Sequence, residues 1–65
     1  MITVNGDHMP HRPGMTVQDI LDAKNYIFRM LAVSVNGQVV PRKEYKTTQV
    51  PDGAEVQVIH MISGG

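Results

Sequence analysis

Alternating apolar and polar residues predict a β-hairpin at the start of the chain. Ile2 and Val4 flank Thr3, and the Asn5-Gly6 pair that follows favours a two-residue turn, because both residues tolerate positive φ. We expect residues 8–12 to form the returning strand. A proline at position 10 cannot donate a hydrogen bond to a neighbouring strand, so this strand is expected at an edge of the sheet.

The apolar spacing then changes to that of a short helix. Its buried side is expected to carry Val17, Ile20 and Leu21. Thr16 suits the N-cap position, and Asp19, three residues further on, completes the pattern of a helix start. We expect two to three turns that stop near Asn25. Residues 26–31 are apolar without a clean period, and we interpret them as a buried, partly helical connector.

A second hairpin and a long last strand complete the predicted elements. Residues 31–35 and 38–40 flank an Asn-Gly turn, and a proline at position 41 ends the second of these strands. A short helical turn is expected over 43–46, a turn at 51–53, and a strand over 54–62.

This order of elements predicts an α+β roll: one main helix packed on one face of a mixed sheet of four to five strands. The last strand is expected to lie centrally, parallel to the first. Val56 and Val58 then face the helix, and alternation places Gln57, Ile59 and Met61 on the open face. Two interpretations are open for these three residues: they form a partner-docking patch, or other segments of the chain cover them.

Composition narrows the classes of function. Sixty-five residues form one domain, whose core is too small to enclose a substrate pocket, which favours a binding or carrier module over an enzyme. Six basic and six acidic residues balance, so neither nucleic acid nor a membrane is an expected partner. The absence of cysteine and of a signal-like start suggests a cytoplasmic protein.

The chain ends in Gly64-Gly65, directly after the last predicted strand. Glycine lacks the β-carbon that restricts backbone conformation, so such a tail can thread through a narrow channel and carry its carboxylate into another protein. The alternative is a frayed end without function. From the tail residues alone, both interpretations stay open.

Several short motifs together resemble the ThiS family of sulfur carriers. They are Thr16-Val17, Ile20-Leu21, Val35-Asn36-Gly37, Val40-Pro41-Arg42, Tyr45, Asp52-Gly53 and Ser63-Gly64-Gly65. The resemblance spans the whole chain and implies the ubiquitin-like β-grasp fold. It also implies a domain over residues 1–61 and a flexible tail over 62–65.

The resemblance also implies a chemistry for the tail. The Gly65 carboxylate would be adenylated with ATP and magnesium by an adenylyltransferase of the ThiF type. A cysteine desulfurase relay would then convert it to a thiocarboxylate, which donates sulfur to a thiazole synthase of the ThiG type in thiamine biosynthesis. Ile62, Ser63 and Gly64 would enter the partner's active site. The chain itself would be a protein co-substrate, not an enzyme, and would bind no cofactor or metal.

Three rival functions remain open from the sequence. They are a sulfur carrier like the small subunit of molybdopterin synthase, a ubiquitin-like protein modifier, and an interaction module with an inert tail. His8 and His11 lack a carboxylate or cysteine at metal-binding spacing, and we interpret them as exposed strand residues. The basic residues Arg42, Lys43 and Lys46 form either a solvated loop or a contact for an acidic partner surface.

Overall fold

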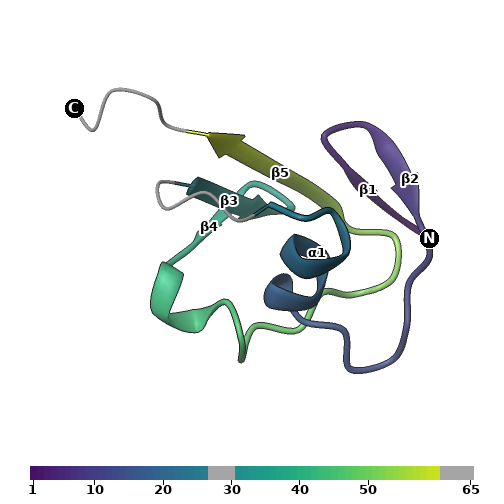
Figure 1. Cartoon of the computed structure of the whole chain (residues 1–65). Coiled ribbons are helices and arrows are strands. Elements are labelled where there is room, and N and C mark those ends of the chain that lie inside the picture. The colour runs from purple at the N-terminus through teal and green to yellow at the C-terminus, as the bar shows by residue number, and fades with distance from the viewer. Residues whose placement is uncertain (27–30, 61–65) are drawn as a thin grey trace.

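A computed structural model describes residues 1–26 and 31–60 of the protein. Along the chain it forms β1 (Ile2–Val4), β2 (Asp7–Met9), α1 (Val17–Ala23), β3 (Leu31–Val35), β4 (Gln38–Val40), the 3₁₀ helix η1 (Arg42–Glu44) and β5 (Glu55–His60) (Figure 1). The strands make one mixed sheet in the order β2-β1-β5-β3-β4. The predicted α+β roll is confirmed.

The last strand, β5, lies at the centre of the sheet, as the sequence predicts. It runs parallel to β1, with Val4 opposite Val56. On its other side it runs antiparallel to β3 and pairs with all of that strand, from Val35 opposite Val56 to Leu31 opposite His60. Its neighbours on both sides therefore fix the direction in which β5 leaves the domain.

Helix α1 covers one face of the sheet (Figure 1). Its start has the predicted capping box: the Thr16 hydroxyl accepts from the Asp19 amide at 3.3 Å, and the Asp19 carboxylate accepts from the Thr16 amide at 2.9 Å. Asn25 follows in the left-handed region with φ 59°, which confirms the predicted stop. The core between helix and sheet contains Ile2, Val4, Met15, Val17, Ile20, Leu21, Val33, Val40, Tyr45, Val50, Ala54, Val56 and Val58.

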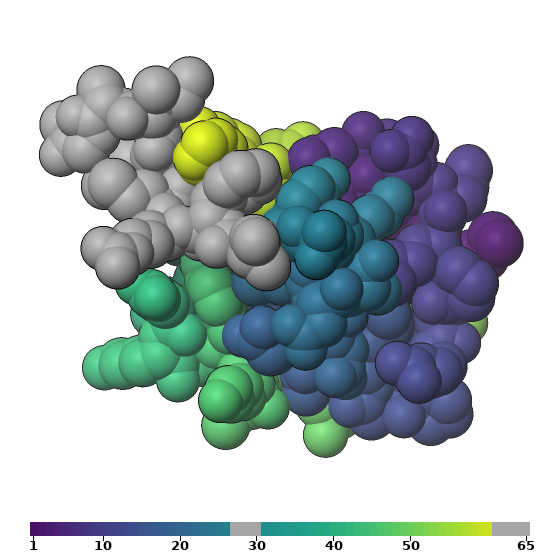
Figure 2. Space-filling model, in the orientation of Figure 1, coloured from purple at the N-terminus to yellow at the C-terminus, as the bar shows by residue number. Residues whose placement is uncertain are grey.

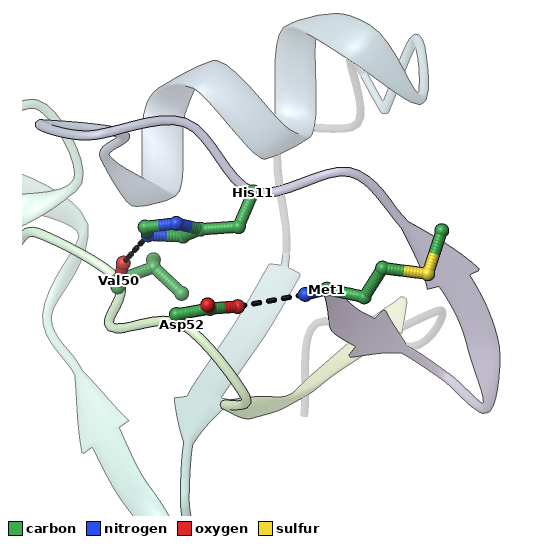
Figure 3. A network of polar contacts seen from close by, with 4 residues as sticks. All are labelled: Met1, His11, Val50 and Asp52. Atoms are coloured by element: carbon green, nitrogen blue, oxygen red, sulfur yellow. Dashed lines mark hydrogen bonds and ion pairs between the residues drawn. The ribbon is translucent and has the colours of Figure 1, made fainter.

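The predicted second strand is too long. Strand β2 ends at Met9, directly before Pro10, whose missing amide hydrogen cannot continue the ladder. His11 therefore lies outside the sheet. Its Nε2 is 2.8 Å from the carbonyl oxygen of Val50 (Figure 3). A carbonyl oxygen only accepts, so Nε2 carries the proton. This hydrogen bond connects His11 to the loop before β5.

The same corner contains an ion pair. The Met1 ammonium donates to an oxygen of Asp52 at 2.7 Å (Figure 3), and the amide of Gly53 donates to the Met1 carbonyl at 3.0 Å. The hydrogen bond from the ammonium and its positive charge lower the pKa of the Asp52 carboxyl. Both partners of the pair are about two-thirds exposed, so its contribution to stability is small.

The remaining predicted elements hold with small shifts. The expected helical turn over 43–46 is η1, which begins one residue earlier, directly after the extended Pro41, and ends two residues earlier, at Glu44. Thr16 and Gln49 form an isolated antiparallel bridge, which the sequence pattern did not predict. Residues 27–30 of the predicted connector and the last two residues of the predicted final strand lie outside the described residues.

Candidate functional site

Two Asn-Gly turns hold β5 from opposite sides. Asn5 and Asn36 both adopt positive φ, at 52° and 51°, as two-residue hairpin turns require. The backbone amide of Asn5 donates to the Val56 carbonyl at 2.9 Å, and that of Asn36 donates to the Glu55 carbonyl at 2.8 Å. Each turn thus closes its own hairpin and also contacts the central strand.

The Asn5 side chain extends this contact beyond the end of β1. Its Oδ1 accepts from the amide of Val58 at 2.8 Å, and its Nδ2 donates to the carbonyl of the same residue at 3.0 Å. Asn36 makes one such side-chain bond, from the Glu55 amide to its Oδ1 at 2.9 Å. A side-chain amide offers both a donor and an acceptor, and can therefore replace a missing strand partner. The Asn5 side chain thus holds β5 in register towards its C-terminal end, whereas the Asn36 side chain holds its first residue.

The open face of the sheet is the second feature of the site. Strand register places Gln57, Ser34 and Val39 in one row and Ile59 beside Ala32 in the next. Ile59 is 58% exposed and Val39 is 76% exposed, whereas the neighbouring β5 residues that face the helix are buried. Gln57 is exposed as well. The predicted open-face positions of Gln57 and Ile59 are thus confirmed, and their role in docking stays a prediction.

Val39 is a member of this face that the sequence reasoning missed. A two-residue turn at Asn36-Gly37 pairs Val35 with Gln38, and therefore Ser34 with Val39. From the turn signal alone, Val39 could have been predicted to pair with Ser34, which on its other side pairs with Gln57.

Other predicted site residues lie outside the described part of the chain. They are Met61, Ile62, Ser63, Gly64 and Gly65. Over residues 1–26 and 31–60, no three His, Cys, Asp or Glu side chains come together as a metal-binding group. Within the same ranges, no helix is both long enough and apolar enough to span a membrane.

Comparison with known proteins decides the family. The model of the ThiS family matches residues 2–65, which is nearly the whole chain. The chain belongs to the ThiS family. It is thus a sulfur carrier of thiamine biosynthesis, and a carrier rather than an enzyme.

Individual ThiS-related proteins agree in sequence and in fold. The sulfur carrier protein ThiS of Escherichia coli is 30% identical over 64 residues, covering 98% of this chain and 97% of that protein. The crystal structure of the thiamine biosynthesis protein ThiS of Geobacter metallireducens superposes with a TM-score of 0.79 at 28% identity. That match covers 98% of this chain and 97% of the other. The β-grasp fold implied by the resemblance is confirmed.

A thiazole synthase of Paramagnetospirillum magneticum is also 30% identical over 64 residues. The match covers 98% of this chain but only 20% of that much longer protein. A ThiS-like segment therefore occurs there within a protein named as a thiazole synthase.

Proposed function

We propose that the Gly65 carboxylate is the group that carries sulfur. The observation that carries this proposal is the family match, which runs through the terminal Gly64-Gly65. The fold supports it, because the tail follows the central strand of the sheet, whose register is fixed by β1, β3 and two asparagine side chains. A rigid domain that ends in a glycine tail can be recognised by one surface and react at another.

The chemistry requires activation, because a carboxylate oxygen is a poor leaving group. The Gly65 carboxylate attacks the α-phosphorus of ATP on a ThiF-type adenylyltransferase, with magnesium, and pyrophosphate leaves. The resulting acyl adenylate is electrophilic at carbon, and a sulfur nucleophile from a cysteine desulfurase relay displaces AMP. When the nucleophile is a persulfide, a second thiol cleaves the acyl disulfide and releases the thiocarboxylate. Glycine adds no side chain that would hinder either attack.

The thiocarboxylate then supplies sulfur to a thiazole synthase of the ThiG type. The relative in which a ThiS-like segment belongs to a thiazole synthase supports this assignment of the acceptor. We assign docking of the partner enzymes to the open sheet face, with Gln57, Ile59 and Met61 as predicted and Val39 added. Exposed apolar side chains beside a reactive tail are typical of a surface that is covered in a complex.

The deciding experiment is intact-mass spectrometry. The chain is incubated with its cognate adenylyltransferase, magnesium ATP and a persulfide source, and the expected product contains one sulfur in place of one oxygen. A chain that lacks Gly65 is the control and should stay unchanged. If the cognate adenylyltransferase, in active form, leaves the full-length chain unmodified, the proposal is wrong.

A further inference from the structure

Three of the six basic residues lie within five positions, at Arg42, Lys43 and Lys46. All three are exposed. Together with Gln18 and Tyr45 they line an open hollow of about 610 Å³ on the surface. Among the residues that the structure describes, no carboxylate lines this hollow: Glu44, the acidic residue of the same segment, lines the neighbouring groove beside β4 instead. The hollow is therefore a locally cationic surface on a chain with zero net charge.

The charges of this cluster are not neutralised within the described chain. Two ion pairs occur over residues 1–26 and 31–60, from the Met1 ammonium to Asp52 and from Lys24 to Asp7. Neither involves residues 42–46. Three neighbouring cations without a partner raise the local potential, and they attract negative groups that approach this side of the molecule.

The backbone beneath the cluster is anchored. The amide of Gln18 donates to the Tyr45 carbonyl at 2.8 Å, and the amide of Thr48 donates to the Glu44 carbonyl at 2.9 Å. Tyr45 is buried, and its hydroxyl donates to the carbonyl of Leu31 at 3.3 Å. The cluster is thus presented at a fixed position relative to helix α1 and strand β3.

This anchoring also places the cluster at the end of the domain from which the tail leaves. Leu31, which Tyr45 contacts, is the strand partner of His60 at the end of β5. Figure 1 shows η1 on the same side as the arrowhead of β5, with the N-terminus on the opposite side. In the space-filling view, this green segment projects from the lower left of the molecule (Figure 2).

We propose that Arg42, Lys43 and Lys46 form a docking surface for an acidic patch on the enzyme that receives the tail. The proposal rests on the proposed function, because that function requires a protein to dock at this end. A protein surface fits better than a small anion. The hollow is open, and its buried lining residue, Tyr45, already uses its hydroxyl within the fold. Several carboxylates spread over a surface match three separate exposed cations.

The test measures the association rate of the full chain with its cognate adenylyltransferase by stopped-flow fluorescence. The triple variant Arg42→Glu, Lys43→Glu, Lys46→Glu should associate about tenfold or more slowly at about 0.05 M salt. The difference should shrink at about 0.5 M salt, where screening acts within a few ångströms. Thermal melting of the variant should match that of the wild type, since the three side chains are exposed.

Arg12 provides a matched control. It is exposed and lines a different hollow, with Pro13 and Gly14 among its neighbours. Arg42→Glu and Arg12→Glu change the net charge equally. Because the proposal depends on where the charge lies, only Arg42→Glu should slow association markedly. Equal effects of the two single variants, or a triple variant as fast as the wild type, would overturn the proposal.

Two further outcomes separate this proposal from the proposed function. If the wild type acquires sulfur but the triple variant associates normally, the docking surface is wrong and the carrier function stands. If the wild type is not modified at all, the proposed function is wrong, and the docking proposal that rests on it is wrong as well. Saturable binding of pyrophosphate to the isolated chain at these three residues would make the hollow a small-anion site, and would also overturn the proposal.

Discussion

The contact between Asn5 and Val58 gives a quantitative prediction about the end of the central strand. Replacing Asn5 with glycine removes both side-chain bonds to Val58 and keeps a residue that adopts φ 52° without strain. The backbone bond from residue 5 to the Val56 carbonyl does not require the side chain. The substitution thus isolates the contribution of the side-chain amide.

The second turn supplies a matched control. Asn36→Gly makes the same chemical change at φ 51°, but it removes one side-chain bond, to the Glu55 amide. The extra flexibility of glycine in the unfolded chain costs a similar free energy at both sites and cancels in the comparison. With about 1 kcal/mol for each hydrogen bond, Asn5→Gly should lower the free energy of unfolding by about 1 kcal/mol more than Asn36→Gly does.

Urea denaturation measures the free energies, and amide hydrogen exchange locates the effect. The Val58 amide should exchange faster in Asn5→Gly and remain protected in Asn36→Gly, because the first variant removes its acceptor. Equal destabilisation by the two substitutions, together with unchanged exchange at Val58, would show that Asn5 does not hold β5.

Three further predictions concern the tail, the open face and the N-terminal corner. Gly65→Ala should fold normally but slow adenylation about tenfold or more, because the added methyl displaces the carboxylate. The exchange of pyrophosphate into ATP measures the rate of adenylation. Equal rates for the variant and the wild type would contradict a narrow channel in the adenylyltransferase. Ile59→Ser should weaken adenylyltransferase binding by about tenfold in calorimetry, with an unchanged melting temperature, since this 58% exposed side chain would be buried in the complex. The ammonium of Met1 lowers the folded-state pKa of Asp52, so its stabilisation is present at neutral pH and is lost as the pH falls through that pKa. The small difference in melting temperature between wild type and Asp52→Asn should therefore begin to shrink near about pH 4 and disappear once the pH is below the lowered pKa. A constant gap would contradict the role of the ion pair.

Local patterns predicted most of the fold because they report on burial and turn geometry. Alternation placed Val56 and Val58 inside and Gln57 and Ile59 outside, since a strand shows successive side chains to opposite faces. The second strand was predicted too long, because its alternation does not show where a missing amide ends the ladder.

Non-local contacts could not be predicted in the same way. His11 bonds to Val50, and Asn5 bonds to Val58, across 39 and 53 positions of the sequence. In each case the side chain bonds to a backbone group, of Val50 or of Val58, and a backbone group has no residue-specific signature in a sequence. Gly65, by contrast, was identified through the family's motifs, and its chemistry stays a prediction.

The parallel pairing of β5 with β1 and its antiparallel pairing with β3 have a mechanical consequence. A partner that grips the tail pulls on β5 along the strand axis, away from Glu55 and past His60. Such a load shears the hydrogen bonds to both neighbouring strands together, because these bonds run across the direction of pull. An edge strand pulled sideways would instead release its bonds one at a time. Under the proposed function, the domain can therefore bear tension on β5 while an enzyme acts on the carboxylate.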